Sequence, residues 1–94
     1  MEAPMEFIES NHSIRYVDHA GKMLAEITFP ETEAGIATID HTCVDPTLRG
    51  QGIAGQLMEQ ALKVIEREGL KVRPTCSYAA SWFERHPDRS DLLA

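Results

Sequence analysis

The sequence has few of the residues that mark several specialised classes of protein. Its 94 residues include two cysteines, one tryptophan and no apolar run long enough to cross a membrane. Two cysteines are too few for a disulfide framework, and Cys43 and Cys76 lack the spacing of a metal site. The acidic first six residues do not resemble a secretory signal. We therefore expect a cytoplasmic protein with reduced thiols and no bound metal.

Positive charge is also scarce. Nine Lys and Arg residues stand against 15 Asp and Glu residues, which gives a formal net charge of −6. This balance argues against a nucleic-acid binder, which normally has a basic face. A net negative charge of this size commonly serves only to keep a protein soluble. It would also attract a cationic acceptor such as an amine. With 43% hydrophobic and 26% charged residues, the chain has the composition of one globular domain spanning residues 1–94.

The hydrophobic patterns divide the chain into a strand-rich part and a helix-containing part. Short alternating runs predict an antiparallel meander, with a polar loop at Pro30–Gly35 and strands at Met5–Glu9, Ser13–Asp18, Met23–Phe29 and Ile36–Val44. Helical spacing then predicts a helix over Ile53–Glu68, which Gly69 ends. A short strand over Leu70–Arg73 follows. A second helix is predicted over Tyr78–Arg85, with Ser77 as its N-cap and Pro87 beyond its end. The tail from Pro87 to Ala94 has no defined pattern.

This order of elements predicts an α/β fold. A strand–helix–strand unit of this length implies a parallel strand pair with a right-handed crossover. We therefore expect one mixed sheet, antiparallel in its first part and parallel at its end, followed by a C-terminal helix.

A glycine-rich turn joins the fourth strand to the long helix. Gly50 and Gly52 allow positive φ and close approach of a ligand to the backbone. The first amides of a helix lack intrahelical partners, and helix polarity favours an anion there, usually phosphate. No carboxylate occurs in the helix before Glu59, and only Thr47 offers a capping side chain nearby. The pattern predicts phosphate binding, with a simple tight connection as the alternative.

Two motifs resemble a known family. Arg49-Gly50-Gln51-Gly52-Ile53-Ala54 is similar to the Gln/Arg-x-x-Gly-x-Gly/Ala signature of the Gcn5-related N-acetyltransferases. The segments His41–Val44 and Pro74–Tyr78 resemble the small, single-domain YjdJ-type branch of that superfamily, and the likeness covers residues 14–93. The resemblance implies an acetyltransferase fold and acetyl-CoA as the cofactor, with its pantetheine arm between two strands that splay apart. The cofactor-binding residues that it implies are Cys43, Val44, Arg49, Gly50, Gln51, Gly52, Ile53 and Ala54.

Three side chains are candidates for catalysis. Cys76 precedes a predicted helix start, where a thiolate is favoured, so it either forms an acyl-enzyme or only lines the cleft. His41 is the candidate base if no bulge shifts the strand, which would place it on one face with Ala37, Ile39 and Cys43; the alternative is a hydrogen-bonded core histidine. Tyr78 is the candidate acid that protonates departing coenzyme A, with a packing role as the alternative.

The acceptor side departs from the larger family. Only a turn at Ser10–Ser13 separates the first two strands, where full-length members insert one or two helices. We expect this side to be open or completed by another subunit, in a monomer or weak homodimer. The function predicted is transfer of an acetyl group to an amine, by direct attack or through Cys76. The alternatives are a non-catalytic acyl-CoA-binding module and a structural domain with a vacant turn.

Overall fold

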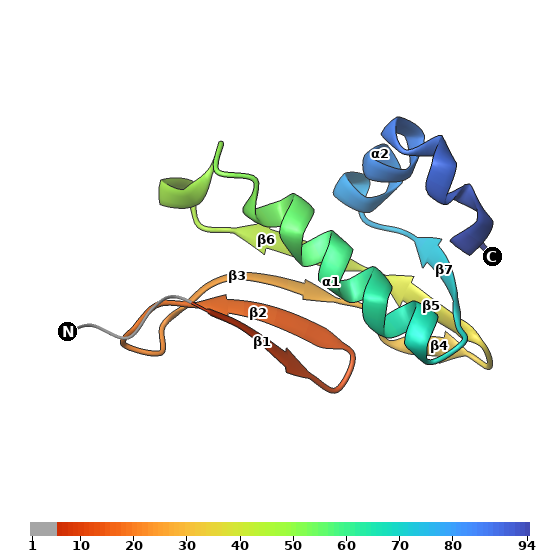
Figure 1. The fold of residues 1–94 in the computed structure, drawn as a ribbon, viewed down its shortest axis with the longest axis horizontal. Helices are drawn as coiled ribbons and strands as arrows, with labels where there is room; N and C mark the ends of the chain where they lie inside the picture. Colours follow the sequence, from red (N-terminus) through yellow and green to blue (C-terminus); the bar gives the residue numbers. More distant parts are fainter. Residues whose placement is uncertain (1–5) are drawn as a thin grey trace.

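The computed structural model describes residues 6–94, and its elements form two sheets and two main helices (Figure 1). The first sheet is antiparallel and has the order β1 (Glu6–Ser10), β2 (Ser13–Val17), β3 (Met23–Thr28) and β6 (His41–Val44). The second has the order β4 (Glu31–Glu33), β5 (Ile36–Ile39) and β7 (Lys71–Pro74), with β5 and β7 parallel. The predicted meander and parallel β-α-β unit are confirmed. The single mixed sheet is wrong, because the strands separate into two.

The break between the sheets lies within the predicted fourth strand. Asp40 leaves the strand path between β5 and β6, where its N–H donates to the Thr28 carbonyl at 3.3 Å. Its carboxylate accepts a hydrogen bond from the Thr28 hydroxyl at 2.5 Å. These bonds hold the start of β6 against the end of β3, so Ile36–Val44 forms two strands rather than one.

Asp40 also shifts the side-chain phase. Across the β3–β6 pair, the fully buried Ala25 and Ile27 lie opposite Val44 and Thr42. Val44 and Thr42 therefore point to the core face, whereas His41 and Cys43 point to the other face. The prediction that His41 and Cys43 share a face with Ala37 and Ile39 is wrong, because the interruption at Asp40 changes the alternation by one residue.

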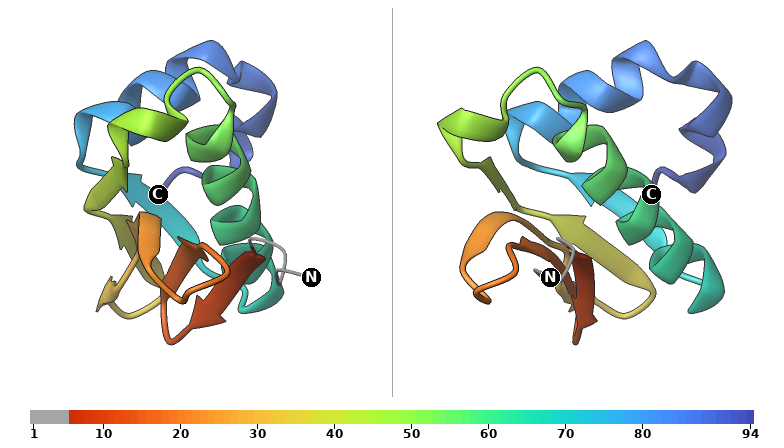
Figure 2. Two further views of the ribbon diagram at one scale, coloured as in Figure 1. Left: turned by 90° about the vertical axis from the view of Figure 1, so that its left-hand side faces the viewer. Right: turned by 60° about the vertical axis from the view of Figure 1, so that its left-hand side comes forward.

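Helix α1 (Ile53–Arg67) covers the core face of both sheets. It packs against β2, β3, β6 and β7, and Figure 2 shows it lying along one side of the strands. Its apolar stripe is buried at 6% exposure or less, and it consists of Ile53, Leu57, Met58, Ala61, Leu62, Val64 and Ile65. The helix ends before Gly69, which has φ of +72° as the predicted C′ residue should.

The C-terminal part is more ordered than the sequence predicted. Helix α2 (Ser77–Arg85) starts at Ser77 itself, and its N-cap is Cys76, so the assignment of Ser77 as the cap is wrong. The helix ends before Pro87 as predicted. The tail then forms a 3₁₀ segment, η2 (Pro87–Leu92), which buries Leu92, and Leu93 forms a bridge to Val72.

Two smaller differences concern the N-terminal half. The predicted polar loop contains β4, which pairs with β5. The predicted first strand begins with Met5, which lies outside the described residues, and β1 runs one residue further than expected, to Ser10. Across residues 6–94, none of the helices has the length and apolar character needed to span a bilayer.

Candidate functional site

The site forms where two neighbouring strands separate. Strands β5 and β7 run side by side as far as the pair Ile39 and Pro74, and the amides of Thr75 and Cys76 both donate to the Ile39 carbonyl, at 3.1 and 3.2 Å. Beyond this point β6 continues along β3, whereas the chain after β7 enters α2 (Figure 1). We call the gap between β6 and the segment that follows β7 the fork. Its narrow end lies where Thr42 Oγ1 and Cys76 Sγ are 3.7 Å apart.

One edge of β6 is open in the described sheet, because β3 is its only strand neighbour there. The Asp45 N–H donates to the Leu24 carbonyl on β3 at 2.7 Å. Because donors alternate in direction along an antiparallel strand, the amide of Cys43 also points toward β3, and those of Thr42 and Val44 point toward the open edge. The Val44 N–H is therefore available to a group lying in the fork.

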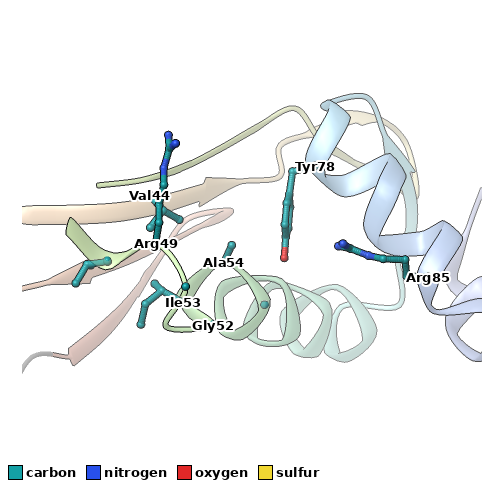
Figure 3. Close-up of a pocket in the computed structure, with 10 residues that line it drawn as sticks. Val44, Arg49, Gly52, Ile53, Ala54, Tyr78 and Arg85 are labelled. Carbon is teal, nitrogen blue, oxygen red and sulfur yellow. The ribbon is translucent and has the colours of Figure 1, made fainter. Parts of the chain in front are cut away.

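A pocket of about 400 Å³ lies beside this edge, between the start of α1 and helix α2 (Figure 3). Its lining comes from the end of β6, from the turn that follows it, and from one face of α2. The residues that line it are Val44, Leu48, Arg49, Gly50, Gly52, Ile53, Ala54, Gly55, Tyr78 and Arg85.

The start of α1 presents free backbone donors to this pocket. Gly50 and Gly52 have φ of +85° and +76°, and Gly52 is an N-cap that provides no side-chain hydrogen bond. The first amide with a partner in the helix is that of Gln56, which donates to the Gly52 carbonyl at 3.1 Å. Within residues 6–94, the N–H groups of residues 52–55 have no acceptor. Together with the helix dipole, these donors make a site for an anion.

The alternative that Thr47 caps this helix is not supported by the structure. Thr47 belongs to a short 3₁₀ turn, η1 (Pro46–Leu48), where Asp45 is the N-cap. The Asp45 carboxylate accepts from the Thr47 hydroxyl at 2.6 Å and from the Thr47 N–H at 2.9 Å. These two bonds lower the pKa of Asp45 below its ordinary value. Asp45 and Thr47 thus satisfy each other and leave the α1 amides free.

Two arginines flank the pocket without carboxylate partners among the described residues. Arg49 is exposed, and Figure 3 shows its side chain extending away from the start of α1. Arg85 projects from α2, and its guanidinium points toward the Tyr78 hydroxyl (Figure 3). Because neither guanidinium is held in an ion pair within residues 6–94, both are available to phosphate oxygens.

Tyr78 forms the wall of the pocket that faces α1. Its ring is half-buried, and its hydroxyl points toward the first turns of that helix (Figure 3). Burial raises the pKa of Tyr78, with the nearby Arg85 charge acting in the opposite direction. The phenol therefore keeps its proton at neutral pH, as a proton donor must.

The family model for GCN5-related N-acetyltransferases matches residues 13–92 of the chain. The chain belongs to this family. The match covers both strands of the fork, the glycine-rich turn and both helices. It does not distinguish the YjdJ-type branch, which stays a prediction.

Solved structures of the acetyltransferase family have the same fold. A GCN5-like protein from Staphylococcus aureus, determined in solution, is 26% identical with a TM-score of 0.81, over 98% of this chain and 90% of that one. The GNAT-family protein YhbS from Escherichia coli, in complex with CoA, is 24% identical with a TM-score of 0.60, over 66% of this chain and 38% of that one. The ribosomal-protein-S18-alanine N-acetyltransferase from Escherichia coli is 20% identical with a TM-score of 0.64, over 83% of this chain and 54% of that one. No curated protein sequence matches the chain.

This chain spans only part of the two Escherichia coli proteins, 38% and 54% of their lengths. Strands β1 and β2 are joined through Asn11 and His12 alone, as the sequence predicted, so no helix lies between them. The inserted helices that the resemblance implies for longer members are therefore absent from residues 6–94.

The three catalytic candidates lie in different surroundings. Tyr78 lines the pocket, whereas Cys76 sits at the narrow end of the fork, half-buried, with its Sγ accepting from the Ala79 N–H at 3.4 Å. His41 is exposed on the opposite face of β6 and does not line the pocket. The sequence reasoning did not single out Leu48 and Gly55, which complete the lining. Gly55, one position after the motif, is the lining residue that the spacing alone could have suggested.

Proposed function

We propose that this chain is an acetyl-CoA-dependent N-acetyltransferase that acts on an amine of a small molecule or a protein. One observation carries the proposal: the acceptor-free amides of residues 52–55 open onto a pocket that Tyr78 also lines. Family membership supports the reaction type. The likeness in fold to YhbS, whose structure contains CoA, supports the cofactor.

The chain's own residues fit coenzyme A. The amides of residues 52–55 would hold the pyrophosphate, and Gly50 and Gly52 leave open space beside that backbone. The exposed Arg49 side chain extends away from these amides in the structure and would turn toward the phosphates to add its charge. The open edge of β6 would pair with the pantetheine arm, as an added strand would. When bound, the cofactor supplies an acetyl thioester that an amine can attack. The Val44 N–H would then hydrogen-bond the carbonyl oxygen and stabilise negative charge on it.

Two routes of transfer are consistent with the side chains at the fork. In the direct route, a neutral amine would attack the thioester carbonyl and lose its extra proton to solvent, while Tyr78 would donate its proton to the departing thiolate and later regain one from solvent. In the second route, the Cys76 thiolate first takes the acetyl group and then passes it to the amine. His41 faces away from the pocket, so the proposed mechanism does not use it as a base.

A second candidate function is an acyl-CoA-binding module without turnover. The direct connection of β1 to β2 favours it, because the described chain builds no acceptor wall, and no base reaches the pocket lining. Such a module would need a partner protein to supply whatever responds to the bound acyl-CoA.

Cofactor binding is tested by calorimetric titration of the full chain with coenzyme A. We expect Arg49→Met to weaken binding about tenfold or more, because a charge-assisted contact to phosphate is lost. Arg67→Met is the matched control, since it removes the same charge from the far end of α1 and should leave the affinity within about twofold. Equal affinities in the two variants would contradict the assigned phosphate site.

Turnover and route are tested by intact-mass analysis after incubation with acetyl-CoA, with and without a panel of amines. Acetylated amine in the product mixture supports the enzyme, and its absence with every amine supports the binding module. An added acetyl mass that is lost in Cys76→Ala supports the covalent route. Amine turnover that survives in Cys76→Ala supports direct transfer.

A further inference from the structure

We propose that Glu26, His41 and Cys43 form a binding site for a zinc-like divalent cation. One carboxylate oxygen, one imidazole nitrogen and the thiol sulfur of these residues all lie within 4.8 Å of one another. The group lies on the face of β3 and β6 that points away from α1, so it is separate from the coenzyme A pocket.

The backbone brings these three residues together. His41 and Cys43 are two positions apart on β6, so their side chains share a face. Glu26 lies directly opposite Cys43 in the β3–β6 register and diagonal to His41. Directly opposed residues have Cβ atoms about 4.5–5.5 Å apart. The juxtaposition thus follows from strand register.

The chemistry of the set favours zinc. Thiolate, imidazole and carboxylate are the three protein donors that Zn²⁺ uses, and three of them with a fourth open position is the pattern of sites that keep a water or ligand. His41 is exposed, so solvent can reach that fourth position. Binding requires Cys43 to lose its thiol proton to solvent, with the sulfur electron pair then forming the bond to the metal.

Within residues 6–94, none of the three side chains makes a hydrogen bond, an ion pair or a ring contact. On the β2 side, Arg15 lies directly opposite Glu26, and its terminal nitrogen bonds the Ser10 hydroxyl at 3.3 Å rather than the Glu26 carboxylate. Arg15 therefore borders the site, and its positive charge lowers the affinity for a metal ion.

Spacing along the sequence could not reveal this group. The linear distance between Cys43 and Cys76 excludes a Cys-x-x-Cys motif, and Glu26 is 15 positions before His41. The interruption at Asp40 is what turns His41 and Cys43 to the same side as Glu26.

Cobalt is the probe for the first test, because a thiolate ligand gives bound Co²⁺ an intense near-ultraviolet absorption band. The full chain, freed of metal and reduced, is titrated with Co²⁺, and we expect the band to saturate at one equivalent and to disappear on addition of Zn²⁺. Cys43→Ser should abolish it. Cys76→Ser is the matched control, since it removes the other cysteine and should leave the band intact.

Competition titrations of zinc affinity test the other two ligands. We expect Glu26→Gln and His41→Gln each to weaken Zn²⁺ binding at least tenfold, since loss of even a supporting partner of a ligand costs about 10–100-fold. Arg15→Met should tighten it. Circular dichroism confirms that each variant is folded. Absence of the cobalt band, loss of the band in Cys76→Ser, or unchanged zinc affinity in both ligand variants would overturn the site. None of these readouts depends on coenzyme A, so they test the metal site separately from the proposed function.

Discussion

The Arg85 charge lies close enough to Tyr78 in the pocket to affect the pKa of the phenol. The phenol is half-buried, which raises its pKa, and the guanidinium favours the phenolate and so lowers it. We therefore expect Arg85→Met to raise the pKa of Tyr78 further. The measurement is a spectrophotometric titration of tyrosinate in a Tyr16→Phe background, where Tyr78 is the remaining tyrosine. Arg73→Met is the control, because Arg73 is paired with Glu33 and does not line the pocket.

The same shift affects the pH dependence of stability. Because the pKa of Tyr78 is higher in the folded chain than in the unfolded chain, its stabilising contribution is complete below about pH 10. It is lost as the pH rises through the folded-state pKa. The free energy of unfolding should thus fall less steeply above pH 10 in Tyr78→Phe than in the parent chain. Parallel curves for the two proteins would contradict the burial of this phenol.

Gly52 and Gly55 provide a test of backbone conformation at the helix start. A methyl group on either residue would meet nothing within 4 Å, but Gly52 has φ of +76° and Gly55 lies inside the helix. We expect Gly52→Ala to destabilise the fold by about 1–2 kcal/mol through left-handed strain. Gly55→Ala should stabilise it by about 0.5–1 kcal/mol. Urea unfolding of both variants without ligand measures the difference, and a cost at Gly55 with none at Gly52 would refute the assigned N-cap.

At the scale of elements, Cys76 has a structural role that must be separated from any chemistry. Its sulfur caps α2 by accepting from the Ala79 N–H, so Cys76→Ala should lower the free energy of unfolding by about 0.5–1 kcal/mol. Cys76→Ser retains an acceptor at the N-cap and should be at least as stable as the parent chain. Thermal unfolding measures both. Equal losses in the two variants would show that the thiol contributes by packing rather than by capping.

The two helices were predictable because their signals are local. The apolar stripe of α1 repeats at helical spacing, Gly69 ends the helix, and Pro87 lies beyond the end of α2. The split of the fourth strand was not predictable from local pattern, because Ile36–Val44 reads as a single strand rich in β-branched residues. What divides it is a pair of hydrogen bonds to Thr28, 12 positions earlier in the chain. Contacts at that range leave no periodic pattern in the segment itself.

Local sequence patterns predict the candidate site only in part, for the same reason. The anion-binding turn follows from glycine placement and the absence of acidic residues in the first turn of α1, both of which are visible in the sequence. The positions of His41 and Cys43 depend on strand phase, and their meeting with Glu26 depends on the register between β3 and β6. A one-residue error in phase moves a side chain to the opposite face of a sheet. This is why His41 and Cys43 lie on the face of the sheet opposite to the one that the sequence predicted.

For the molecule as a whole, α1 is the element that joins the two sheets. It packs against β2, β3 and β6 of one sheet and β7 of the other, and Leu62 in its stripe is fully buried. Leu62→Ala should therefore lower the free energy of unfolding by about 2–5 kcal/mol. Lys63→Ala, on the exposed side of the same helix, should change it by no more than about 0.5 kcal/mol.

The loss at Leu62 should be shared by both sheets rather than confined to one. Trp82, the only tryptophan, is buried in α2 beside the second sheet, so its fluorescence reports that part of the chain, while far-ultraviolet circular dichroism reports all of it. If α1 makes one cooperative unit of the two sheets, urea transitions followed by the two signals coincide in the parent chain and shift together in Leu62→Ala. Separate midpoints would mean that the sheets unfold independently. The fork between β6 and β7 would then be a boundary that can open without global unfolding.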